Sequence, residues 1–153
     1  MSAQRPGVGV GIVLFRDDTL RETLLVRRGK APSEGQWAPP GGRVEWGEAL
    51  SAAAQRELHE ETGLDGSMLS PLHLFGAFDA MQRDTRGQAT FHYVLVEFTA
   101  IAHADAMPVA ADDAAECRWW PVAALHQAQP QVGTLAEAVR QAQTWWAVQK
   151  RFV

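Results

Sequence analysis

The chain has 153 residues, of which 46% are hydrophobic and 21% charged, and its formal net charge at pH 7 is −4. This length and composition predict one globular domain over residues 1–153, with enough apolar residues to bury a full core. The negative net charge argues against a nucleic-acid partner, because nucleic-acid binding calls for a basic patch. The single cysteine, Cys117, excludes an internal disulfide and a cysteine-rich zinc site.

The N-terminal third predicts two strands followed by an ordered loop. Residues 1–7 contain no apolar signal core, and no stretch of the chain approaches membrane-spanning length, so we expect a cytoplasmic protein with no membrane partner. Residues 8–15 alternate small and apolar side chains and read as a strand, and residues 23–27 read as a second one. Residues 29–42 are rich in glycine and proline and predict a loop.

The C-terminal half predicts further strands and a final helix. Strand-like runs cover residues 72–78, 90–98 and 117–120, and a short helical turn begins at Pro121. Residues 134–149 place apolar side chains at helical spacing, which predicts an amphipathic helix; these side chains are Leu135, Val139, Ala142 and Trp146.

The most informative run lies between these halves, where three glutamates fall within five positions after a glycine-rich turn. A helix turns about 100° per residue, so Glu57, Glu60 and Glu61 share one helix face. Unpaired carboxylates held so close repel one another, and oxygen-rich clusters of this kind suit Mg²⁺ or Mn²⁺. The sequence therefore predicts a divalent-metal site on this helix.

A solvated helix face is the alternative reading of these glutamates. The helical wheel argues against it, because the glutamates continue a stripe that begins with the apolar contact of Leu50. The opposite side of the wheel is the expected solvent face, and it carries Gln55, His59 and Thr62. Carboxylates on a stripe that faces the protein body need a partner, and a metal ion would supply it.

This run resembles the signature of the Nudix hydrolases at nine defining positions, which are Gly42, Glu48, Arg56, Glu57, Leu58, Glu60, Glu61, Gly63 and Leu64. The resemblance implies an α+β fold, namely an α/β/α sandwich with a mixed central β-sheet. It also implies a pyrophosphohydrolase that uses Mg²⁺ or Mn²⁺ to hydrolyse a diphosphate linkage in a nucleotide. Many small members of the family are homodimers, so the resemblance suggests a homodimer.

The resemblance further implies roles for the residues of this motif, which we call the Nudix box. Glu57, Glu60 and Glu61 would be metal ligands, with the Gly42 carbonyl as an additional one, since glycine lets the backbone approach closely. One of these carboxylates, or an acidic loop residue, would be the catalytic base. Arg56 would orient a box carboxylate. For Glu48 two roles stay open, namely metal contact and a structural role at the start of the helix.

Outside the box, Arg28, Trp37 and the acidic run each have a structural alternative. Arg28 matches a position where the family places a cation for phosphate, and a surface ion pair is the alternative. Trp37 is a candidate for stacking on a base, and packing in the core is the alternative. Asp113 and Glu116 belong to an acidic run where relatives place a further metal ligand or base, and a solvated loop is the alternative. Residues 79–88 are expected to form a substrate loop, with Asp79 and Arg83 as its contacts.

The sequence leaves three alternatives open, namely two classes of substrate and a protein that binds a nucleotide without cleaving it. The layout is similar to that of bacterial ADP-ribose pyrophosphatase-like members, which favours an ADP-ribose-like substrate. The proline that many of those members carry about fifteen residues past the box is replaced here by Asp79 and Ala80. A nucleoside triphosphate, including an oxidised or methylated one, therefore stays a candidate. So does a sensor that binds a nucleotide without cleaving it, although such proteins often lose box glutamates and this chain keeps them.

Overall fold

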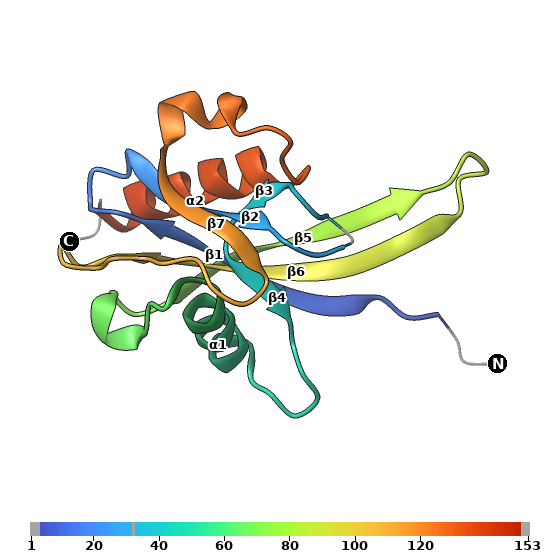
Figure 1. Cartoon of the computed structure of the whole chain (residues 1–153), viewed down its shortest axis with the longest axis horizontal. Helices are drawn as coiled ribbons and strands as arrows, with labels where there is room; N and C mark the ends of the chain where they lie inside the picture. The colour runs from blue at the N-terminus through green and yellow to red at the C-terminus, as the bar shows by residue number, and fades with distance from the viewer. Residues whose placement is uncertain (1–3, 32, 151–153) are drawn as a thin grey trace.

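The computed structural model describes residues 4–31 and 33–150 and contains one mixed β-sheet between two helices (Figure 1). In chain order the elements are β1 (Gly7–Phe15), β2 (Glu22–Arg28), β3 (Trp37–Ala38), β4 (Gly41–Arg43), α1 (Leu50–Thr62), the 3-10 helix η1 (Gly66–Met68), β5 (His73–Arg83), β6 (Ala89–Ile101), β7 (Ala114–Pro121), the 3-10 helix η2 (Val122–Gln127) and α2 (Leu135–Lys150).

Strand β1 lies at the centre of the sheet, whose main order is β3-β2-β1-β6-β5. It runs parallel to β6 over its whole length, with Gly7 opposite Tyr93 and Phe15 opposite Ile101. The other pairings are antiparallel: β1 with β2 and β4, β2 with β3 and β7, and β5 with β6. The predicted mixed sheet is therefore confirmed.

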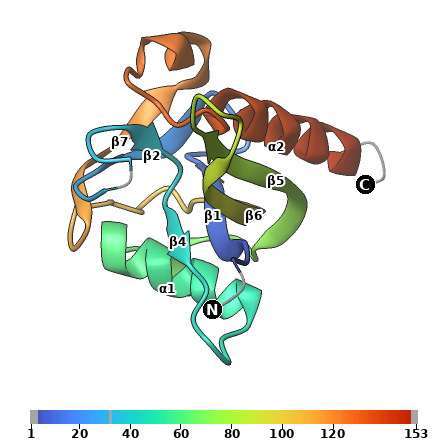
Figure 2. The same cartoon turned by 90° about the vertical axis from the view of Figure 1, so that its right-hand side faces the viewer.

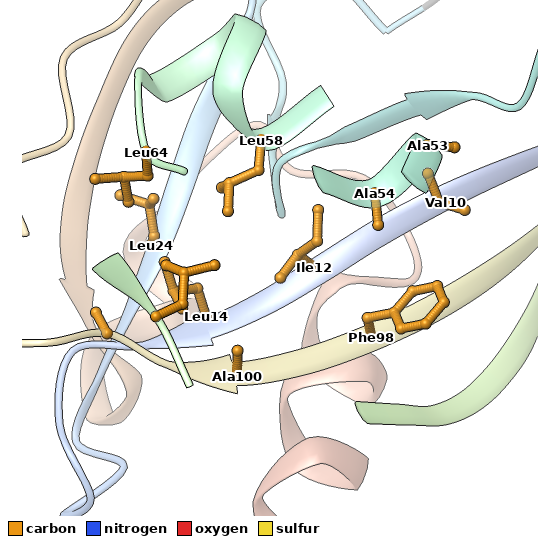
Figure 3. Close-up of a cluster of buried hydrophobic side chains, with 12 residues drawn as sticks. Val10, Ile12, Leu14, Leu24, Ala53, Ala54, Leu58, Leu64, Phe98 and Ala100 are labelled. Atoms are coloured by element: carbon orange, nitrogen blue, oxygen red, sulfur yellow. The ribbon is translucent and has the colours of Figure 1, made fainter. Parts of the chain in front are cut away.

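The two helices cover opposite faces of this sheet (Figure 2). Because successive side chains of a strand point to opposite faces, Ile12 of β1 packs with Leu58 of α1, as Figure 3 shows, whereas Val13 packs with Val139 of α2. Each face thus has its own hydrophobic core, and the predicted α/β/α sandwich is confirmed.

Two sequence expectations for this region need correction. The predicted loop 29–42 contains β3 and the start of β4, because the backbone there pairs with β2 and β1. The predicted strand 72–78 continues to Arg83, so residues 79–83 belong to β5 and not to a loop. The polar side chains of that extension hid it in the sequence, yet the backbone continues to pair with β6 as far as Ala89.

Helix α1 ends at Thr62, immediately before Gly63. Gly63 adopts a left-handed conformation with φ 74° and donates its backbone N–H to the His59 carbonyl at 2.8 Å. No helix within the described ranges is long and apolar enough to cross a membrane. The expectation that residues 1–7 contain no signal core concerns residues 1–3, which lie outside the described residues. Residues 32 and 151–153 of the predicted domain also lie outside them.

Candidate functional site

The glycine turn of β4 and the glutamates of α1 meet at one edge of the sheet. The Gly41 N–H donates to Glu61 Oε1 at 2.7 Å. At Gly42 a Cβ atom would collide with the Glu57 carboxyl group. The absence of a side chain at Gly42 therefore lets this carboxylate lie against the β4 backbone.

Arg56 lies among the remaining carboxylates of the box. Its Nη1 donates to Glu57 Oε1 at 3.0 Å and to Glu60 Oε2 at 3.2 Å. It also forms two hydrogen bonds with Glu48, and these hold the pKa of Glu48 down at about 2, with a smaller contribution from the Glu45 backbone N–H. Its Nη2 further donates to the Arg43 carbonyl at 2.9 Å. The arrangement agrees with an orienting role for Arg56 and with a structural role for Glu48.

Two of the glutamates are held in surroundings that disfavour their charged form. Glu61 is 3% exposed, and burial raises its pKa to about 8, against the opposing hydrogen bond from Gly41. Burial also raises the pKa of Glu57, and the hydrogen bond from Arg56 opposes the shift. A buried carboxylate needs either a proton or a cationic partner.

The donor set fits a hard divalent cation. Carboxylate oxygens and a backbone carbonyl are the ligands that Mg²⁺ and Mn²⁺ prefer, and Glu57 and Glu61 are both at the β4 edge. Across residues 4–31 and 33–150, no three acidic, histidine or cysteine side chains already converge as a metal site. Arg56 instead draws Glu48, Glu57 and Glu60 towards its own guanidinium.

The expected solvent face of α1 is correct for two residues and wrong for the third. Gln55 and His59 are exposed, but Thr62 is fully buried and its Oγ1 donates to the Leu58 carbonyl at 2.6 Å. The last turn is covered by an incoming segment, whose Val109 N–H donates to the Thr62 carbonyl at 2.9 Å. A helical wheel contains no information about such a distant segment.

A pocket of about 750 Å³ adjoins the box. Its floor includes Gly9 and Gly11 of β1 and Leu95 and Glu97 of β6, and its lining also includes Gly41 and Gly42. Arg28 also lines it; the Arg28 Nε is buried without a hydrogen-bond partner, and its charge lowers the pKa of Glu61. The predicted phosphate-binding cation thus lines the pocket and acts electrostatically on one glutamate of the box.

Trp37 is 7% exposed and packs in the α2-side core, with its ring centroid 5.2 Å from that of Trp120. Almost none of the ring surface is open to a base, which favours the packing alternative for this residue.

The acidic run is close to the box but is already paired. Asp113 forms an ion pair with Lys30 at 2.6 Å, and its charge contributes to the raised pKa of both Glu57 and Glu61. Glu116 accepts a hydrogen bond at 3.3 Å from the Nε of Arg27, which lies on β2. Asp113 is thus electrostatically linked to the glutamates of the box.

The two candidates of the expected substrate loop are separated. Asp79 lines the pocket from β5 and lies 3.3 Å from His92 Nε2. Arg83 lies at the far end of β5, where its Nη1 donates to the Gly87 carbonyl at 2.9 Å in the hairpin turn. Only Asp79 of this pair is in the pocket lining.

Glu97 is a pocket residue that the sequence reasoning missed. It is 3% exposed, lines the pocket from β6, and one of its carboxyl oxygens, Oε2, has no hydrogen-bond partner. Burial alone raises its pKa to about 7. The available signal was a carboxylate in the otherwise apolar run of residues 94–98, where period-two alternation places it on one face with Leu95.

The amino-acid sequence is similar to those of known proteins. A sequence model described as the NUDIX domain matches residues 5–142. An ADP-ribose pyrophosphatase of Methanocaldococcus jannaschii is 39% identical over 82 residues, which are 54% of this chain and 45% of that protein. Diphosphoinositol polyphosphate phosphohydrolase 2 of Rattus norvegicus is 40% identical over 81 residues, or 53% of this chain and 41% of that protein. The chain spans less than half the length of these curated relatives.

Solved structures resemble the whole fold. The NUDIX domain of Shewanella oneidensis NrtR, complexed with ADP ribose, has a TM-score of 0.72 and 25% identity, covering 99% of this chain and 91% of that one. A MutT NUDIX hydrolase from Burkholderia pseudomallei has a TM-score of 0.71 and 29% identity, covering 90% of this chain and 98% of that one.

Proposed function

Because the chain belongs to the Nudix family, we propose that it is a metal-dependent pyrophosphohydrolase that cleaves the diphosphate linkage of a nucleoside diphosphate joined to another group. An ADP-ribose-like substrate is favoured. Two similar proteins support this choice, since one is named an ADP-ribose pyrophosphatase and another was solved with ADP ribose.

The observation that carries the proposal is the junction of the pocket with the box at Gly41 and Gly42. A diphosphate at this junction would have the Arg28 guanidinium on the pocket side and the glutamates of α1 on the other. Arg28 is suited to the contact because its buried Nε lacks a partner, and a guanidinium matches phosphate oxygens in geometry.

The residues that would hold the metal ion are Glu57, Glu60, Glu61 and the Gly42 carbonyl. When bound, a divalent ion supplies neutralisation of phosphate charge and a lowered pKa for bound water. In the metal-free protein burial raises the pKa of Glu61 to about 8, so binding of the metal ion would displace a proton from this carboxyl group. Arg56 would fix the directions of Glu57 and Glu60 through its Nη1.

The decisive experiment measures product release from ADP-ribose, NADH, dinucleoside polyphosphates, sugar nucleotides and canonical or oxidised triphosphates. Each substrate is incubated with Mg²⁺, with Mn²⁺ and with EDTA. We expect turnover of ADP-ribose that EDTA abolishes. A preference for a triphosphate would keep the reaction class and move the substrate to the alternative.

A folded protein that binds these nucleotides without cleaving any of them would overturn the proposal. The sensor reading would then hold, with the box and the pocket as its binding site.

A further inference from the structure

The floor of the pocket is built from two neighbouring strands with complementary side chains. On β6, Tyr93, Leu95 and Glu97 point to the same face, because they alternate along the strand. Each lies opposite a glycine of β1, with Gly7, Gly9 and Gly11 as the paired residues. A Cβ atom at each glycine would meet the side chain opposite it, at 2.9 Å from Leu95 Cδ2 in the case of Gly9. The β6 side chains therefore lie across β1.

Glu97 is the polar end of this otherwise aromatic and apolar row. Its carboxyl lies over Gly11, which is paired on its other side with Gly41. It is 3% exposed and its Oε2 has no partner. An unpaired buried polar oxygen destabilises the folded protein, so a ligand that bonded to it would remove a penalty already present in the free protein.

The carboxyl is chemically distinct from those of the box. Burial alone perturbs it, whereas the neighbouring charges of Asp113 and Arg28 both affect Glu61. No ion pair involves Glu97 among the described side chains. Without a nearby cation it is poorly suited to bind a diphosphate, whose charge would repel it.

We propose that Glu97 is a specificity-determining residue that hydrogen-bonds an O–H or N–H group of the substrate's nucleoside. This inference rests on the proposed function for the identity of the substrate, and it deepens that function by naming what the pocket recognises. The diphosphate would lie at Gly42, and the nucleoside would extend from there over β1 and β6. Neighbouring strands in a sheet are about 4.8 Å apart, so a nucleoside is long enough to contact both β1 and β6.

Two parts of a nucleoside offer the required donor, namely the ribose hydroxyls and the amino or imino groups of the base. Both give the same hydrogen bond to a carboxyl oxygen. The surrounding row favours a nucleoside over a more polar ligand, since Tyr93 and Leu95 offer flat and apolar contact. Phe91 extends this surface, with its ring centroid 5.0 Å from that of Tyr93.

The test measures the binding of AMP by titration calorimetry in EDTA, so that hydrolysis plays no part. In Glu97→Leu we expect AMP affinity to fall about tenfold or more, which is the loss of one hydrogen bond to a carboxyl group. Glu97→Gln keeps an acceptor oxygen and is expected to stay within about threefold of the unaltered protein. Glu137→Gln, an exposed glutamate of α2, is the matched control and leaves the affinity unchanged.

Two analogues identify the donor. With the unaltered protein, weaker binding of 2′-deoxy-AMP assigns the ribose, and weaker binding of IMP assigns the base amino group. In Glu97→Leu, the analogue that binds the unaltered protein more weakly than AMP is expected to bind with the same affinity as AMP. If that variant fails to fold, the same comparison is made in Glu97→Asp, whose shorter side chain withdraws the carboxyl.

The outcomes separate this inference from the proposed hydrolysis. AMP affinity that is unchanged in Glu97→Leu, or undetectable in the unaltered protein, would overturn the role of Glu97 even if ADP-ribose is cleaved. Conversely, loss of AMP binding in Glu97→Leu would support the role of Glu97 even if the unaltered protein cleaves no substrate. In that case only the proposed hydrolysis would fail.

Discussion

Arg56 holds Glu48 through two parallel hydrogen bonds, with Nε 2.6 Å from Oε2 and Nη2 2.9 Å from Oε1. The two residues are eight positions apart and join the loop before α1 to the middle of the helix. The Nη1 of the same guanidinium reaches Glu57 and Glu60. One rigid, planar group thus fixes the directions of three carboxylates.

The first prediction is that Arg56→Lys weakens Mn²⁺ binding about 10–100-fold, the usual cost of disturbing a group that orients metal ligands. A lysine ammonium cannot make the two-point contact and also reach the helix carboxylates. Titration calorimetry with Mn²⁺ measures the loss. Arg140→Lys, in the exposed pair with Glu137 on α2, is the control, and equal affinities in the two variants would contradict the role.

The second prediction concerns the proposed metal ligands. Glu57→Gln and Glu60→Gln should each lower kcat by about 10²–10³-fold, since removing a charged ligand forfeits several kcal/mol of transition-state stabilisation. Steady-state hydrolysis of the preferred substrate measures this. Glu137→Gln on α2 should leave kcat unchanged. Full activity in Glu60→Gln would remove that residue from the site.

The third prediction uses the close approach at Gly42. In Gly42→Ala the new methyl group would collide with the Glu57 carboxyl, so Glu57 must move and hydrolysis should fall at least tenfold. Gly66→Ala is the matched control, because a Cβ there meets nothing within 4 Å. The thermal unfolding of both variants shows whether the effect is confined to the site. Similar activity in both variants would mean that this contact is unimportant.

The fourth prediction separates two adjacent arginines of β2. Arg28 lines the pocket, whereas Arg27 forms its contact with Glu116 of β7. Arg28→Ala should raise KM about tenfold or more, since it removes a charge-assisted contact to phosphate. Arg27→Ala should leave KM within about twofold. If the two variants have the same KM, Arg28 has no specific contact with the substrate.

The fifth prediction is a pH dependence of stability. Burial raises the folded-state pKa of Glu97 from 4.5 to about 7, so its stabilising contribution is complete below about pH 4.5 and is lost as the pH rises to 7. The loss amounts to at most about 3 kcal/mol. Urea unfolding between pH 5 and pH 8, without metal ions, should therefore show a flatter profile for Glu97→Gln than for the unaltered protein. Parallel profiles would contradict the shifted pKa.

The sequence predicted the parts of this fold that depend on local patterns. Fixed spacing placed the three glutamates on one helix, and the structure contains that helix. The α/β/α sandwich followed from the family resemblance, and its mixed sheet is confirmed by the parallel pairing of β1 with β6.

What the sequence could not predict depends on distant contacts. The burial of Thr62 results from a segment nearly fifty positions away in the chain, and the extension of β5 results from pairing with β6. Glu97 was overlooked because its burial depends on its pairing with Gly11 of β1, more than eighty positions away in the chain. The catalytic base, the metal, the homodimer and the cytoplasmic location stay predictions.

The glycines of β1 make the size of the pocket unusually easy to alter. The space over Gly9 and Gly11 exists because two methyl groups are absent, and the side chains of Leu95 and Glu97 fill part of it. A single alanine at Gly9 would push the flexible end of Leu95 towards the ligand, and its methyl group would also lie 3.2 Å from the Gly42 carbonyl oxygen of the box. One carbon atom at this position would therefore change the width of the pocket and press on a backbone atom of the box at the same time.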